Sequence, residues 1–237
     1  MMIVNEALGE NGQGGGGTLG NLMDSLGIPM DGSLGYYENT IGVLSLLQQL
    51  KDAGWDNPGG TKTNFSDWKK IIKVEAITEQ ITILNNAAGS NNVTPEFKET
   101  NSFLYKGKSE GFRILISMKN ISSVLEYAFI IGHEINHSIT DYFRNDFYKA
   151  INSTPNSATS RDAYGFFQEY NSYNWEKRLG NSNILNAFDT TYSRHGPGCH
   201  AGGINWGYSQ TAIDVVKNNL NNLNKAWSIF YNNNLKK

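Results

Sequence analysis

The longest uninterrupted helical pattern in this sequence lies between Ser122 and Ala150. The stretch contains no proline, and its apolar residues recur at the three- and four-residue spacing that places them on one side of an α-helix. It also carries the sequence HEINH at residues 133–137. We therefore predict a largely buried helix over about residues 122–150, with Asn120 or Ser122 as its N-terminal cap.

The two histidines of this stretch have the spacing of a metal site. Residues four apart lie about one helical turn apart on the same face, so the imidazoles of His133 and His137 can converge on one ion. Imidazole nitrogens bind Zn²⁺ at about 2.0–2.1 Å, and we predict a zinc site here. Glu134 points away by about a quarter turn. There a carboxylate can take the proton of a water that attacks a carbonyl. The structural alternative is a helix whose histidines are satisfied by hydrogen bonds.

The remaining patterns predict further helices and a small sheet. Apolar residues at helical spacing predict helices over residues 38–53, 66–88, 161–179 and 210–232, with Gly180 ending the third. The short β-branched run at residues 111–118 predicts a strand. A second strand at residues 101–106 would pair with it as a hairpin. Residues 181–207, rich in Gly and Asn, are predicted to form a long loop.

These elements predict a mostly helical α+β fold with a small sheet just before the 122–150 helix. The length of 237 residues fits one sizeable domain. Residues 1–20 contain four consecutive glycines, at residues 14–17, and are interpreted as a flexible tail or linker. A single domain is then expected over residues 21–237. The linker favours an upstream domain in a longer protein.

Composition argues against several classes of protein. The formal net charge of -2 argues against nucleic acid as a partner. The one cysteine, Cys199, excludes an intrachain disulfide and a cysteine-based zinc finger. No apolar run approaches the roughly 20 residues of a membrane span. Residues 1–10 lack the pattern of a signal peptide, and the compartment stays open.

Residues 133–137 resemble the active-site helix of the zincin superfamily of metallopeptidases. In that superfamily a strand borders the substrate groove just before the helix, and residues 111–118 occupy that position. The resemblance covers about residues 100–180. It implies a zincin-like fold and a zinc-dependent peptidase acting on a protein or peptide. Of the family's residues, the two zinc histidines correspond to His133 and His137, and the general base corresponds to Glu134.

The third zinc ligand divides the zincins. The metzincin class needs Gly and His where this chain has Thr140 and Phe143, so that class is excluded. The glutamate class places a Glu on a later helix, and the 161–179 helix offers Glu169 and Glu176. The resemblance implies Glu169, which lies nearer the middle of that helix, as the ligand. Glu176 and Asp162, the latter from a partial match to the aspartate class, stay as alternatives.

The Glu-x-x-x-Tyr-x-x-Glu run at residues 169–176 narrows the resemblance further. It is similar to the downstream helix of small metallopeptidase domains at the C-termini of bacterial RHS/YD-repeat toxins, although the RHS repeat core is absent from this chain. The larger glutamate class has an Asp where this chain has Tyr173. That Asp supports a zinc histidine, and either Asp141 or Glu176 is the candidate for its role here.

The predicted loop at 181–207 carries the other two histidines. A loop beside a zinc site can supply a proton donor to the oxyanion of the tetrahedral intermediate, and we predict His195 in this role. His200 and Tyr192 are alternatives, and a Cys199–His200 nucleophile pair is disfavoured because adjacent loop residues seldom reach the needed geometry. The competing functional class is an inactive metal-binding or protein-interaction module, which also suits a toxin or effector domain.

Overall fold

The structure is a computed structural model that describes residues 34–58, 63–90, 93–201, 204–205 and 207–236. The expected tail at residues 1–20 lies outside the described residues. The long helices occur on both sides of a small sheet in the sequence. They are α3 (Leu34–Asp52), α5 (Glu75–Ala88), α6 (Val124–Ala150), α7 (Ala158–Arg178), α8 (Ala187–His195) and α9 (Gln210–Leu235), with short helices η1 (Phe65–Asp67), α4 (Trp68–Ile71) and η2 (Met118–Asn120).

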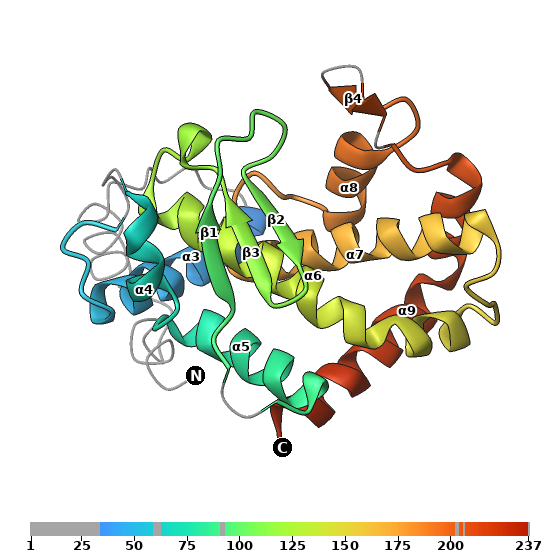
Figure 1. The fold of residues 1–237 in the computed structure, drawn as a ribbon, viewed down its shortest axis with the longest axis horizontal. Coiled ribbons are helices and arrows are strands. Elements are labelled where there is room, and N and C mark those ends of the chain that lie inside the picture. The colour runs from blue at the N-terminus through green and yellow to red at the C-terminus, as the bar shows by residue number, and fades with distance from the viewer. Residues whose placement is uncertain (1–33, 59–62, 91–92, 202–203, 206, 237) are drawn as a thin grey trace.

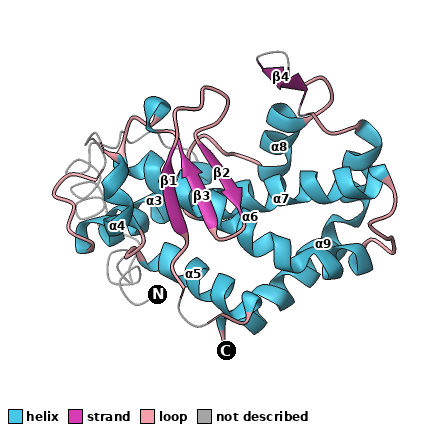
Figure 2. Cartoon of the chain, in the orientation of Figure 1, coloured by secondary structure: helices cyan, strands magenta, loops and turns pink. Residues whose placement is uncertain are grey.

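Three strands form the main sheet, which precedes α6 in the sequence. Its strands are β1 (Glu96–Glu99), β2 (Gly107–Glu110) and β3 (Arg113–Ile116), in the order β1-β3-β2. β1 runs parallel to β3 and β2 runs antiparallel to it. A second, two-stranded ladder joins β4 (His200–Ala201) to β5 (Ile204–Asn205). Figure 2 shows the sheet among the helices, and the expected mostly helical α+β fold with a small sheet before α6 is confirmed.

Helix α6 runs through the middle of the molecule, with the sheet on one side and α5, α7 and α9 packed around it (Figure 1). Ile131, Ile135 and Ile139 belong to one apolar cluster, and Phe143 and Phe147, nearer the C-terminal end of the helix, belong to another. All five side chains are fully buried. The burial of one long helix in two clusters anchors the HEINH segment on both sides. No helix among the described residues is both long and apolar enough to cross a membrane.

Helix α6 begins with a hydrogen-bonded cap. The cap residue is Ser123, not the predicted Asn120 or Ser122: its hydroxyl accepts the Glu126 N–H at 3.1 Å. The Glu126 carboxylate reaches back to the N–H and the hydroxyl of Ser122, both at 2.7 Å, and to the Lys106 ammonium. This reciprocal arrangement satisfies free N–H groups of the first turn and fixes where the helix starts.

We expect the stability contributed by Glu126 to depend on pH. Burial alone would raise the pKa of Glu126, but Lys106 and Ser122 outweigh it and hold that pKa below its ordinary value of 4.5. The unfolded state therefore binds the proton more readily, so the contribution is complete well above pH 4.5 and is lost as pH falls through the lowered folded pKa. Glu126→Gln should cost about 1 kcal/mol in unfolding free energy at pH 7. Measured by urea unfolding, the difference in unfolding free energy between the variant and the wild type should become smaller toward pH 3. A difference that does not change with pH would show that the Glu126 charge is not its cause.

Two sequence predictions before α6 are corrected. The helix expected over residues 66–88 is broken at residues 72–74, where Val74 is extended and begins α5. Ile71, Val74 and Ile77, which lie before, at and after the break, are all fully buried. The second strand lies at Gly107–Glu110, not at 101–106.

The predicted hairpin between residues 101–106 and 111–118 places its turn at residues 107–110, which form strand β2 in the structure. The chain actually turns at Gly111, whose φ of 68° suits glycine. One face of β2 lies against α6, where the Ser109 and Ser138 hydroxyls are 2.7 Å apart. Strand β1 was missed for a similar reason, since only Phe97 of its four residues is buried.

The loop expected at residues 181–207 contains helix α8 and the β4–β5 ladder. The Asn186 side chain caps α8 by accepting the N–H groups of Phe188 and Asp189. Ala187 and Thr191 are buried. The Phe188 ring contacts an aromatic residue of α7, so this helix is held by packing. A nine-residue helix is too short for its apolar spacing to be distinctive.

Candidate metal centre

Helices α6 and α7 bring the metal-binding candidates together. They pack along one another, and α7 begins at Ala158, where Ser157 caps it by accepting the Ser160 N–H. Gly132 allows the close approach: a Cβ at this position would lie 1.9 Å from the indole of Trp175. The absence of a side chain at Gly132 therefore sets how near α7 lies to the helix that carries His133.

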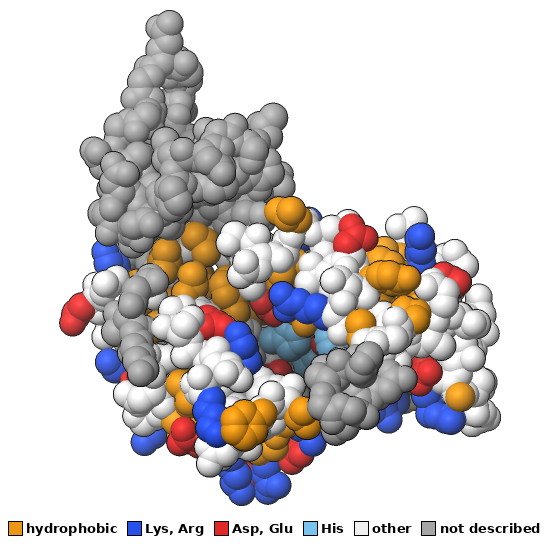
Figure 3. Space-filling model, turned by 90° about the horizontal axis from the view of Figure 1, so that it is seen from above, with side chains coloured by type: hydrophobic (Ala, Val, Ile, Leu, Met, Phe, Trp, Pro, Cys, Tyr) orange, Lys and Arg blue, Asp and Glu red, His pale blue; other side chains and the backbone are white. Residues whose placement is uncertain are grey.

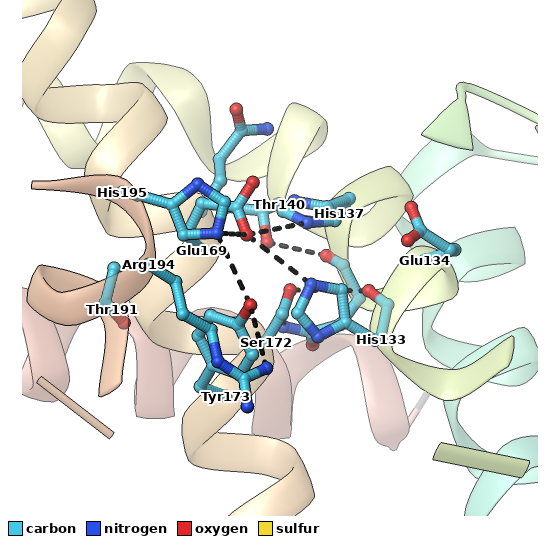
Figure 4. Close-up of polar contacts among 12 residues, drawn as sticks. His133, Glu134, His137, Thr140, Glu169, Ser172, Tyr173, Thr191, Arg194 and His195 are labelled. Carbon is cyan, nitrogen blue, oxygen red and sulfur yellow. Dashed lines mark hydrogen bonds and ion pairs between the residues drawn. The ribbon is translucent and has the colours of Figure 1, made fainter. Parts of the chain in front are cut away.

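Three ligand atoms converge between these helices. The Nε2 atoms of His133 and His137 each lie 3.5 Å from Oε2 of Glu169. The ligand atoms of the three residues all lie within 4.8 Å of one another. His133 is 9% exposed, so the group is recessed below the surface. Figure 4 shows the two imidazoles and the Glu169 carboxylate pointing toward one another.

This donor set fits zinc. Two ligands at about 2.0–2.1 Å from a tetrahedral Zn²⁺ lie roughly 3.4 Å apart. This is close to the 3.5 Å from Oε2 of Glu169 to Nε2 of each histidine. Two histidines and one glutamate are a known ligand set of catalytic zinc sites, which leave a position open for water. The arrangement also has an electrostatic reason. Burial opposes charge on His133, but hydrogen bonds to Glu169 and Glu176 raise its pKa well above the ordinary value. The site thus favours a positive charge between these carboxylates.

Glu176 contacts the second ring nitrogen of His133, Nδ1. Its Oε1 lies 2.6 Å from Nδ1 of His133, on the side of the ring away from Glu169, and its other oxygen accepts a hydrogen bond from Asn181. A carboxylate at this position fixes the ring and leaves Nε2 free for a metal. Glu176 thus contacts Nδ1 of His133, while Glu169 is the carboxylate that lies near the Nε2 atoms of both histidines.

The other carboxylates considered from the sequence lie elsewhere. Asp141 contacts Arg144 and Gln168 on the cleft surface. Asp162 is not in the group of ligand atoms found among the described residues. The acidic residue that comes closest to both histidine Nε2 atoms in the described part of the chain is therefore Glu169.

Glu134 lies beside the three ligand residues and not among them, as Figure 4 shows. Burial raises its pKa above the ordinary value although His137 and His133 oppose the shift. The N–H of Ser109 on β2 contacts its carboxylate. Strand β2 comes this close because Gly107 has no side chain, since a Cβ there would lie 2.7 Å from Oε1 of Glu134. A buried carboxylate with a raised pKa, held beside the ligands, suits a general base.

His195 reaches the same centre from α8. Its Nε2 lies 3.3 Å from Oε2 of Glu169 and 3.3 Å from the hydroxyl of Tyr173. Burial lowers the pKa of His195 and raises that of Tyr173, so both are uncharged at neutral pH. Arg194 adds a third polar group, with Nη1 3.4 Å from the Tyr173 hydroxyl. These three side chains surround one side of the ligand group (Figure 4).

The alternatives to His195 are placed as follows. Tyr192 is 43% exposed, and its hydroxyl donates to Gln210. The side chain of His200 lies outside the described part of the chain. Cys199 donates its thiol to the backbone carbonyl of Ser193. Neither Tyr192 nor Cys199 is among the residues that line the cleft described next.

The ligand group lies at the bottom of an open cleft of about 1420 Å³. In the space-filling view of Figure 3, histidine side chains are visible at the base of a hollow with basic side chains at its rim. One wall is β2 with the segment before it, and the other is formed by residues of α7 and α8, among them Tyr173, Arg194 and His195. The volume is enough for several residues of an extended peptide.

No protein-family model, curated protein or solved structure matches this chain. The centre is therefore described by its own geometry. Sequence reasoning identified His133, His137, Glu169, Glu134 and His195, and the structure gathers all five around one point. It did not identify Ser109 or Arg194 as part of the site. For Arg194 the only signal was its position next to His195.

Proposed function

We propose that this chain is a zinc-dependent metallopeptidase. One observation carries the proposal: the Nε2 atoms of His133 and His137 and Oε2 of Glu169 converge at the base of an open cleft, with the buried carboxylate of Glu134 beside them. If the two histidines only made hydrogen bonds within a structural helix, neither a third converging ligand atom nor an open cleft would be expected at this position.

Each residue has a distinct role in the proposed reaction. Zinc bound by His133, His137 and Glu169 would lower the pKa of a water and polarise the scissile carbonyl. Glu134 accepts the proton of the attacking water and passes it to the leaving amine. His195 and Tyr173, uncharged at neutral pH, stand where hydrogen bonds can stabilise the developing oxyanion.

A protein or peptide is the substrate class that suits the cleft. Strand β2 is an edge strand of its sheet and lines the cleft through Gly107, Lys108 and Ser109. An extended peptide can add to such an edge through backbone hydrogen bonds. Because those bonds involve only backbone groups, they fix a peptide beside the centre without choosing its sequence.

Zinc binding tests the proposal first. Purified chain should retain close to one equivalent of zinc after dialysis, and added zinc should raise its melting temperature because only the folded state binds the ion well. His137→Ala should abolish both effects. Asp146→Asn is the matched control, since Asp146 is a partly exposed residue of the same helix and pairs with Lys149. Less than a tenth of an equivalent of zinc in the wild type would favour a protein-interaction module and end the peptidase proposal.

Zinc retention also distinguishes a residue that binds zinc from one that only positions a zinc ligand. Glu176→Gln should keep the site but weaken zinc affinity by about 10- to 100-fold, because it weakens the contact that fixes His133. Glu169→Gln should have the larger effect, because a carboxylate is lost from the ligand set itself. Equal losses for the two variants would show that Glu176 is a ligand. The amounts of retained zinc and the titration curves decide between these outcomes.

A further inference from the structure

Arg194 lines the cleft, and its side chain contacts Tyr173 there. It lies in the last turn of α8 and is exposed to solvent. Its Nη1 donates to the Tyr173 hydroxyl at 3.4 Å, and its guanidinium carbon lies 5.1 Å from the centre of the Tyr173 ring. A guanidinium has five N–H donors. Most of the donors of Arg194 therefore remain open to a ligand.

The charge of Arg194 is not compensated within the described part of the chain, where no carboxylate forms an ion pair with it. The two lysines of the cleft differ in this respect. Lys106 pairs with Glu126, and Lys108 pairs with Glu110 at 2.8 Å. Arg194 is thus the cleft cation best placed to meet an anionic group from outside. Its contacts with Tyr173 reduce the conformational freedom that it would lose on binding.

The position of Arg194 also limits which part of a substrate it can reach. Contacts of 3.4, 3.3 and 3.3 Å lead from its Nη1 through the Tyr173 hydroxyl and His195 Nε2 to Oε2 of Glu169. An extended peptide advances about 3.3–3.6 Å per residue. The guanidinium therefore lies within about three residues of the bond that would be cleaved.

We propose that Arg194 binds a carboxylate of the substrate, so that the cleft selects peptides with an acidic group close to the cleaved bond. This inference rests on the proposed peptidase function. The planar guanidinium matches a carboxylate in a two-bond geometry, which lysine does not offer. The carboxylate belongs either to an Asp or Glu side chain or to the C-terminus of the peptide.

Binding of peptide hydroxamates to the zinc-loaded chain tests this inference without turnover, because a hydroxamate anchors each probe on the metal. One pair of probes differs only in Glu against Gln, with amidated C-termini. A second pair has neutral side chains and differs only in a free or amidated C-terminus. We expect one acidic probe to bind about 5- to 10-fold tighter than its neutral partner. The pair that shows the preference identifies the source of the carboxylate.

Variants then assign the preference to Arg194. Arg194→Gln should reduce the ratio of affinities to about one, and Arg194→Glu should favour a probe with Lys in place of Glu. Lys108→Gln, which removes a paired cleft cation, should leave the ratio unchanged. The inference is wrong if neither acidic probe is preferred, or if the preference survives Arg194→Gln. If no probe binds and metal analysis finds no zinc, the proposed function fails, and the inference fails with it.

Discussion

Glu134→Gln is expected to abolish peptide hydrolysis while leaving zinc in place. Glutamine has nearly the same shape, so it can occupy the same space between α6 and β2. It cannot accept a proton from water, and loss of a general base typically costs 10²–10⁴-fold in rate. We expect kcat/KM to fall by about 10³-fold. Because the substrate is not known, cleavage is best measured on a peptide mixture from digested proteins, by mass spectrometry of the new termini.

Zinc addition separates this effect from loss of the metal. Glu176→Gln weakens the support of His133, so its activity should recover in excess zinc. Glu134→Gln should not recover, because its zinc content is already normal. Full activity in Glu134→Gln would exclude Glu134 as the base. Activity that returned with added zinc would show that Glu134 acts on the metal affinity and not on the proton transfer.

The part of the centre that comes from one helix could be predicted from the sequence. The spacing of His133 and His137 fixes their relative positions because α6 is a regular helix over that stretch. The direction of Glu134 follows from the same geometry. Helix α6 itself was predictable, because it is long and its apolar residues keep one spacing.

The part that depends on packing between helices was harder to predict. Glu169 and Glu176 are seven residues apart and share a face of α7, so the spacing alone does not say which one meets Nε2 of a histidine. The position of α7 along α6 decides this. It places Glu169 against the Nε2 atoms and Glu176 against Nδ1 of His133. That position depends on the contact between Gly132 and Trp175, which no local pattern reveals.

The wall of the cleft was missed for a different reason. Strand β2 is four polar residues long, and α8 has nine residues with a mixed composition. Neither has enough apolar residues to show a period. Each is fixed by tertiary contacts. Ser109 of β2 contacts Ser138 of α6, and Phe188 of α8 packs against Phe166 of α7. As a result, Arg194 appeared in the sequence as a loop residue without a role.

Gly132→Ala should destabilise the fold and weaken zinc binding together. In an exposed helix this substitution would stabilise by up to about 1 kcal/mol, because alanine has the higher helix propensity. Here the new Cβ would lie 1.9 Å from the Trp175 ring, and both Gly132 and Trp175 are buried. Overpacking of this kind costs about 1–3 kcal/mol and sometimes more. We therefore expect a net loss of about 2 kcal/mol in unfolding free energy measured in urea.

The loss of zinc affinity has the same cause. Trp175 directly precedes Glu176 and lies six residues, about 1.7 turns, beyond Glu169. Any shift of α7 away from Gly132 therefore moves both carboxylates relative to the histidines. A movement of even 1 Å is large compared with the tolerance of zinc–ligand distances. Zinc titrations should show a weaker site in Gly132→Ala, even at temperatures where the variant remains folded.

A double variant shows whether the two residues act through their contact. Trp175→Leu removes the ring atoms that the new Cβ would meet, and by itself it should cost several kcal/mol through the cavity it leaves. Combined with Gly132→Ala, the methyl group enters that space. The loss for the pair should then be smaller than the sum of the single losses by about 1 kcal/mol or more. Simple additivity would mean that Gly132 does not set the distance between α6 and α7. The placement of Glu169 and Glu176 against His133 would then need another explanation, such as the Asn136–Ser172 contact between the same helices.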